Sequence, residues 1–272
     1  MNFEDIIYEK YEGRAKITIN RPQKLNAFTN QTLHEMIEAL IDAWTDKSVG
    51  AVILTGVGDR AFCTGGDQSI RSKDGYAIEE SGEGFQGLSK LPLSNNHSLL
   101  LQTIRTIPKP VIAMVNGYAI GGGHVIHVVC DLTVASANAI FGQAGPRVGS
   151  FDAGYGSAFL ARVVGEKKAR EIWYLCEKYT AQDALAMGLV NRVVEQDRLS
   201  EEVEKICDSL ISKSPTALAA LKASFNADTE SMWGIHTVAG LALNLYYNTD
   251  EAVEGRNAFM EKRPPDFKKF RS

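Results

Sequence analysis

The sequence lacks the features of a secreted, a membrane-spanning or a nucleic-acid-binding protein. It has only four cysteines, scattered without the paired spacing of a disulfide framework or a zinc site: Cys63, Cys130, Cys176 and Cys207. No apolar run approaches the ~20 residues that cross a bilayer, and residues 1–5 predict no secretory signal. A formal net charge of −4 does not favour a nucleic-acid partner. We therefore expect a cytoplasmic protein that binds neither membrane nor nucleic acid.

The composition is that of a globular protein with one large domain, or with one domain and an appendage. The chain has 272 residues, of which 44% are hydrophobic and 23% are charged. Residues 15–20 alternate apolar and polar side chains and predict a strand. An apolar stripe over residues 33–44 predicts a helix, and apolar runs predict strands at 49–56, 111–115 and 132–135. This order predicts an α/β fold with helices packed on sheets.

Two of these strands are followed by glycine clusters. Gly65 and Gly66 come after the strand at 49–56, and Gly121, Gly122 and Gly123 separate the strand at 111–115 from a helix-compatible segment. A strand that ends in glycines aims backbone N–H groups into a common space. Two such ends can each give one N–H to the same oxygen, which is what an oxyanion hole needs. The alternative is that the glycines only permit tight turns.

The remainder of the chain predicts one long loop followed by helices. Residues 72–100 are acidic and rich in Gly and Ser, which predicts either a lid over a site or a tolerated surface insertion. A helix is predicted from residue 99. Beyond residue 156 the pattern is mostly helical, with Thr180 as the N-cap of a short helix and Pro215 at the start of another.

Several motifs, taken in chain order, resemble the crotonase (enoyl-CoA hydratase/isomerase) superfamily. The matching stretches are residues 20–22, 26–28, 61–67, 116–123, 130–132 and 184–190. The resemblance implies a crotonase-type spiral of ββα units over residues 1–195 and a C-terminal helical trimerisation region over residues 196–272. It also implies a homohexamer of paired trimers, acyl-CoA binding and thioester-enolate chemistry. The backbone N–H groups of Gly66 and Gly122 would form the oxyanion hole.

Within the superfamily, residues 141–156 are similar to the naphthoate synthases (1,4-dihydroxy-2-naphthoyl-CoA synthases). Hydratases carry glutamates where this chain has Val125 and Gly145, so water addition is not expected. The resemblance implies a ring-closing, Dieckmann-type condensation of o-succinylbenzoyl-CoA in menaquinone biosynthesis. In synthases with glycine at this position a bicarbonate ion acts as the base, and here Gln143, Gly145 and Trp173 would bind it. A core role for Trp173 remains an alternative.

The same resemblance implies roles for further side chains. Asp152 would act near the ring carboxyl and Ser150 would hold that carboxylate, although turn-forming and capping roles are the alternatives. Tyr247, from a neighbouring subunit, and Tyr76, in the loop, match the two catalytic tyrosines. The expected acyl-CoA contacts are Lys24, Ala27, Thr64, Gly65, Asp67, Gln68, Arg71, Tyr118, Phe259 and Lys262. His124 and His127 are expected to be core or supporting residues, and no metal site is expected.

Two other functions remain open. The ring-opening 2-ketocyclohexanecarboxyl-CoA hydrolases share residues 63–68 and 165–174 with this chain, whereas residues 150–152 favour the synthase. The second alternative is a crotonase-fold binding protein without catalysis. The basic tail at residues 261–269 is either a contact to a neighbour's CoA or a solvated charged end.

Overall fold

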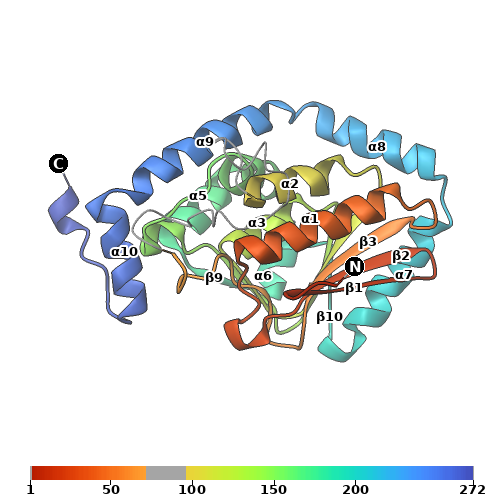
Figure 1. The fold of residues 1–272 in the computed structure, drawn as a ribbon, viewed down its shortest axis with the longest axis horizontal. Coiled ribbons are helices and arrows are strands. Elements are labelled where there is room, and N and C mark those ends of the chain that lie inside the picture. Colours follow the sequence, from red (N-terminus) through yellow and green to blue (C-terminus); the bar gives the residue numbers. More distant parts are fainter. Residues whose placement is uncertain (1, 72–95, 272) are drawn as a thin grey trace.

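A computed structural model describes residues 2–71 and 96–271, and this part of the chain contains two sheets (Figure 1). The larger sheet has the strand order β1 (Ile6–Tyr11), β2 (Arg14–Ile19), β3 (Ala51–Gly56), β5 (Val111–Val115), β7 (Leu132–Ser136) and β10 (Arg192–Val194). The smaller sheet has the order β4 (Ala61–Cys63), β6 (Tyr118–Ile120), β8 (Ile140–Gly142) and β9 (Lys178–Thr180). Pairing is parallel except between β1 and β2 and between β8 and β9.

The chain passes repeatedly from the larger sheet to the smaller one and then into helix. The first two units are β3–β4–α2 (Asn96–Thr106) and β5–β6–α3 (Gly122–Val129). In the third, β7–β8 is followed by the 3-10 helix η2 (Gly145–Val148), the π-helix η3 (Tyr155–Phe159) and α4 (Leu160–Val164). Because each pass adds one parallel strand to each sheet, the chain advances as a spiral. The predicted α/β spiral of ββα units is confirmed.

The other elements cover these sheets. They are η1 (Pro22–Lys24), α1 (Asn30–Thr45), α5 (Glu166–Leu175), α6 (Ala181–Ala186) and η4 (Gln196–Arg198). Thr180 caps α6 as predicted, since its hydroxyl accepts from the Asp183 N–H. The stripe predicted on α1 is buried only in part, because Ile41 and Trp44 are 40% and 39% exposed at the end of the helix.

Four helices and one turn make up the C-terminal region: α7 (Leu199–Ile211), α8 (Pro215–Ala227), α9 (Ser231–Tyr247), α10 (Asp250–Met260) and η5 (Lys268–Phe270). The buried side of α7 packs against Ile53, Ile112 and Val134 of the larger sheet. Helices α8 and α9 run along one edge of the molecule, and α10 lies at its end (Figure 1). Lys222 ties α8 to the core, because its ammonium donates to the Ile104 carbonyl (2.9 Å) and to the Asp131 carboxylate (2.7 Å).

Helix α2 begins earlier than the sequence predicted. The loop was predicted through residue 100, but α2 starts at Asn96, and the Asn96 amide donates to the Asn30 carbonyl of α1 (3.2 Å). The rest of that predicted loop, with Tyr76, lies outside the described residues. No helix in the described part of the chain is long and apolar enough to span a membrane.

Candidate active site

The two glycine clusters come together at the ends of the paired strands β4 and β6. A Cβ added at Gly65 would lie 3.0 Å from the Gly122 backbone nitrogen, so the two chain segments are in direct contact. Gly65 has a φ of +85°, which favours glycine. The expectation that both clusters line one space therefore agrees with the geometry.

Phe28 holds Gly66 in position. The Phe28 N–H donates to the Gly65 carbonyl (2.8 Å) and the Asp67 N–H donates to the Phe28 carbonyl (2.9 Å), so Gly66 and Phe28 form an isolated parallel bridge. In such a bridge the N–H of the middle residue points away from the partner. Within residues 2–71 and 96–271, the Gly66 N–H has no backbone acceptor. Gly122 is the first residue of α3, where a helix leaves N–H groups unpaired.

The ring of Phe28 packs against a histidine beside Gly122. The ring of His97, from the first turn of α2, stacks on Phe28 with the ring centroids 5.3 Å apart. A Cβ added at Gly122 would lie 2.7 Å from the Phe28 ring and 3.4 Å from His97 Nε2. Phe28 thus brings His97 beside the two glycines.

Asp152 lies on the other side of His97. One carboxylate oxygen is 3.8 Å from His97 Nδ1, and the other is 3.7 Å from His236 Nδ1 on α9. The Gly156 N–H donates to Asp152 Oδ1 (3.1 Å). A Cβ at Gly156 would lie 2.6 Å from the Asp152 carboxylate, so the two residues are tightly packed. The predicted acidic residue therefore stands between two histidines.

Ser150 and Tyr247 form a hydroxyl pair near Asp152. Their oxygens are 2.8 Å apart, and burial raises the pKa of the Tyr247 phenol, which keeps it protonated at neutral pH. The Arg71 guanidinium lies 4.3 Å from the centre of the Tyr247 ring. Both hydroxyls belong to one chain. This contact forms because α10 folds back onto the loop at Gly149 and brings the end of α9 with it. That Tyr247 serves the site of a neighbouring subunit stays a prediction.

The residues predicted to bind bicarbonate do not fit that ion as they stand. The Trp173 indole N–H donates to the Gly156 carbonyl (2.6 Å), and the Gln143 amide donates to His124 Nδ1 (3.2 Å) and weakly to the Gly121 carbonyl. A Cβ at Gly145 would lie 2.8 Å from the Ser150 carbonyl oxygen, so this side of Gly145 is filled. Two of the three expected donors are bonded inside the protein, and Trp173 supports Asp152 through Gly156.

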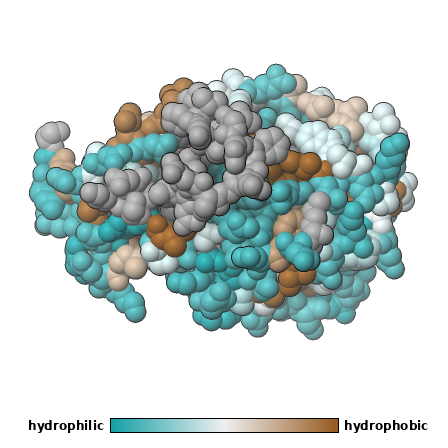
Figure 2. Space-filling model, viewed as in Figure 1, coloured by the Kyte–Doolittle hydropathy of each residue, from teal (hydrophilic) through white to brown (hydrophobic). Residues whose placement is uncertain are grey.

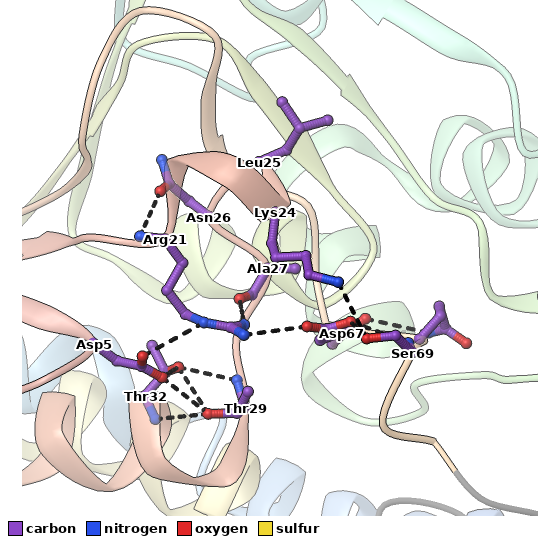
Figure 3. Close-up of polar contacts among 12 residues, drawn as sticks. Asp5, Arg21, Lys24, Leu25, Asn26, Ala27, Thr29, Thr32, Asp67 and Ser69 are labelled. Carbon is purple, nitrogen blue, oxygen red and sulfur yellow. Dashed lines mark hydrogen bonds and ion pairs between the residues drawn. The ribbon is translucent and has the colours of Figure 1, made fainter.

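Several residues predicted to contact CoA form a network beside the glycines (Figure 3). The Arg21 guanidinium lies between Asp5 (3.5 Å) and Asp67 (3.2 Å) and donates to the Ala27 carbonyl. The Lys24 ammonium is 3.4 Å from the Ser69 hydroxyl, which donates to Asp67 (2.6 Å). Two further members of the set lie in this region: Thr64 donates to the Leu25 carbonyl (3.2 Å) and Gln68 to the Gly66 carbonyl (3.3 Å). Asp67 thus anchors the protein's own Arg21, and Lys24 is the exposed cation.

Other predicted CoA contacts lie elsewhere. The Arg71 guanidinium is buried and donates to the Val148 and Gly149 carbonyls (2.8 and 2.5 Å), so it braces the loop beneath Tyr247. Tyr118 begins β6, at the strand end away from the glycines, with Lys178 5.3 Å from its ring centre. Phe259 and Lys262 are exposed at the end of α10.

No sequence pattern predicts a role for His97 or His236. They come from segments far apart in the chain, and His97 lay in a stretch expected to be loop. His124 and His127 are buried as expected, and burial lowers the pKa of His124 to about 3. Among the described residues, no three His, Cys, Asp or Glu side chains are arranged to hold a metal ion.

Comparison with known proteins agrees with this fold. The family model for enoyl-CoA hydratase/isomerase matches residues 9–270. An enoyl-CoA hydratase from Mycobacterium avium subsp. paratuberculosis superposes with a TM-score of 0.83 at 30% identity, covering 98% of this chain and 99% of that one. An enoyl-CoA hydratase/isomerase from Pseudoalteromonas atlantica gives 0.85 at 27% identity, with 97% and 100% covered. Another, from Xanthobacter autotrophicus, gives 0.80 at 27% identity, with 96% and 94% covered.

Fold and site together define a protein of the crotonase class. The chain belongs to the enoyl-CoA hydratase/isomerase family, whose members are typically enzymes that act on acyl-CoA.

Proposed function

We propose that the protein is a 1,4-dihydroxy-2-naphthoyl-CoA synthase, which closes the second ring of o-succinylbenzoyl-CoA. The observation that carries the proposal is the place of Asp152 and of the Ser150–Tyr247 pair, which His97 links to the two glycine N–H groups. These groups suit a substrate that carries a thioester at one end and a ring carboxyl at the other.

Each group has a role in that chemistry. Loss of a proton beside the thioester places negative charge on the thioester oxygen, which the N–H groups of Gly66 and Gly122 would stabilise; one such donor is worth roughly 3–4 kcal/mol of barrier. The carbanion attacks the ring carboxyl carbon, where Ser150, Tyr247 and Asp152 present two hydroxyls and a carboxyl. A new carbon–carbon bond forms and water leaves.

Simple hydration is less well supported. A hydratase needs side chains that add water across a double bond, but Val125 is buried and Gly145 has no side chain. The second candidate is the ring-opening hydrolase, which runs a related carbon–carbon step in reverse and needs the same oxyanion stabilisation. A non-catalytic binding protein would not need the three polar groups of residues 150, 152 and 247.

We also propose that the protein belongs to cells that make menaquinone and that it assembles there. The proposed assembly is a hexamer of two trimers. Large apolar side chains stand exposed on α8 and α9: Leu221, Phe225, Ile235, Val238 and Leu245. Figure 2 shows hydrophobic residues along the upper left edge, where Figure 1 places α9. Exposed apolar patches of this kind mark interfaces.

The test compares the two carbon–carbon reactions. Purified protein is incubated with o-succinylbenzoyl-CoA and, separately, with 2-ketocyclohexanecarboxyl-CoA. We expect kcat/KM for ring closure to be at least about ten times that for ring opening. This corresponds to a barrier that is lower by about 1.4 kcal/mol. Faster ring opening would replace the proposal by the hydrolase, and turnover of neither would favour the binding protein.

A further inference from the structure

His97 has an unused nitrogen at the place where the proposed chemistry removes a proton. Its Nε2 atom is buried and has no hydrogen-bond partner among the residues that the structure describes. The same atom lies 3.4 Å from the position of a Cβ on Gly122, one of the two glycines of the oxyanion hole. A buried polar atom without a partner is rare in folded proteins and calls for a ligand or a chemical role.

Asp152 sets the tautomer of this ring. Its carboxylate lies on the Nδ1 side at 3.8 Å, and a carboxylate there favours the proton on Nδ1 and a lone pair on Nε2. Burial is the main cause that lowers the pKa of His97; Asp152 and the Gly122 backbone raise it, and His236 lowers it only when that ring is itself charged. The ring is therefore neutral at pH 7, which a base requires.

His236 holds the loop that carries Asp152. Its Nδ1 lies 3.0 Å from the Ala153 carbonyl, which can only accept, so Nδ1 carries the proton. In the neutral ring Nε2 then accepts from the Ser98 hydroxyl (2.8 Å). His236 is only 4% exposed, and its Nδ1 has no lone pair to offer a metal ion. His236 thus holds the loop that places Asp152 beside His97.

We propose that His97 is the catalytic residue that takes the proton from the carbon beside the thioester, and that His236 is a positioning residue that acts through Asp152. This inference rests on the proposed function. The C–H bond breaks, its electron pair enters the enolate, and the proton forms a bond with His97 Nε2. The Asp152 carboxylate then faces an imidazolium. The ring carboxyl is attacked in its protonated form, and the proton on His97 joins its hydroxyl group, which leaves as water.

His97 also supplies the base that Gly145 cannot. A residue that shuttles one proton at this carbon serves ring closure and ring opening alike, because the second reaction returns a proton to the same carbon. The assignment to His97 is therefore independent of the choice between the two reactions.

Proton exchange tests this assignment without requiring ring closure. The probe is benzoylpropionyl-CoA, which has the thioester and its neighbouring carbon but no ring carboxyl. In heavy water, mass spectrometry follows deuterium entering the carbon beside the thioester. We expect exchange by the unaltered protein, a loss of about 100-fold or more in His97→Gln, and no change in the control His34→Gln, whose side chain lies on α1.

Each result decides one point. Exchange by His97→Gln within about threefold of the unaltered protein overturns the role of His97 but leaves the proposed function intact. No exchange by the unaltered protein overturns enolate formation, and with it the proposed function. If His97→Gln does not fold, as judged by thermal unfolding, His97→Ala is used with added imidazole, and failure of imidazole to restore exchange overturns the proposal.

A pH profile tests His236. The groups facing His97 are Asp152 and His236, and exchange should fall as the pH drops through the lowered pKa of His97. His236→Gln loosens the loop that holds Asp152, and Asp152 raises the pKa of His97, so the acid limb should move to lower pH while exchange above it persists. If the acid limb of the pH profile does not move in His236→Gln, the positioning role of His236 is contradicted.

Discussion

The hydroxyl oxygens of Ser150 and Tyr247 lie 2.8 Å apart, although 97 positions separate the residues in the chain. Tyr247 is only 6% exposed and its ring stacks under Arg71, which donates to carbonyls of the loop that carries Ser150. The loop and the end of α9 therefore form one rigid wall of the site.

The first prediction concerns the tyrosine hydroxyl. Tyr247→Phe keeps the ring and removes one buried hydrogen bond, which should cost about 1 kcal/mol in the free energy of unfolding. Turnover should fall by about tenfold or more, with KM changed less, because the hydroxyl acts on the ring-closing step. Denaturant unfolding and steady-state kinetics measure the two effects.

Subunit mixing provides the control for this assignment. Tyr247 and Ser150 meet within one chain, and Asp152 belongs to the same loop. Mixed oligomers of Tyr247→Phe and Asp152→Asn subunits should show no more than the sum of the parent activities. Recovery above that sum would mean that the end of α9 is exchanged between chains.

Gly156 gives the second prediction. In Gly156→Ala the new methyl group would lie 2.6 Å from Asp152 atoms, so the carboxylate must move. We expect a loss of about 100-fold in turnover, since displacements of about 1 Å in an active site have effects of this size. Gly234→Ala, with nothing within 4 Å, is the matched control and should behave as the unaltered protein. Equal activity of the two variants would show that Asp152 needs no fixed position.

The third prediction concerns bicarbonate. The Trp173 and Gln143 donors are bonded within the protein, and His97 supplies a base, so turnover in carefully decarbonated buffer should stay within about twofold of the normal rate. Addition of bicarbonate should then have little effect. A strict requirement for the ion would mean that Trp173 releases the Gly156 carbonyl when substrate binds.

The fourth prediction is acid sensitivity of the fold. Burial lowers the pKa of His124 to about 3, whereas an unfolded histidine titrates near 6.5, so below pH ~6.5 the unfolded state binds the extra proton and stability falls. At pH 5 this one group costs about 2 kcal/mol relative to pH 7. His124→Gln keeps an acceptor for Gln143. Between pH 7 and pH 5 its free energy of unfolding should fall by about 2 kcal/mol less than that of the unaltered protein. His34→Gln serves as the control, and an equal loss in both variants would exclude His124 as the cause.

The sequence predicted those features that depend on neighbours in the chain. The apolar β-branched run at 111–115 became β5 with the same bounds, and Thr180 caps α6 because its hydroxyl needs only the N–H three residues on. The glycine clusters at 65–66 and 121–123 were predicted to line one space, and the family resemblance assigned Gly66 and Gly122 within them. Local signals were enough for the strand and for the helix cap.

The hydrogen-bond partners of the side chains in the site depend on contacts between distant segments. The Ser98–His236 bond joins residues 138 positions apart, and nothing in either local pattern indicates it. The indole N–H of Trp173 was assigned to an ion, but it donates a hydrogen bond to the nearby Gly156 carbonyl. Arg71 was expected to contact acyl-CoA, whereas its guanidinium donates to carbonyls of a distant loop inside the protein. A side chain's partner is decided by tertiary packing, which the sequence pattern does not specify.

The most direct measurement uses o-succinylbenzoyl-CoA with deuterium on the carbon beside the thioester. Ring closure through an enolate removes both hydrogens from that carbon when the new ring becomes aromatic. We predict a naphthoyl-CoA product that has lost all of the label, formed more slowly than from unlabelled substrate. Recovery of the labelled substrate unchanged, with no naphthoyl product, would contradict the account.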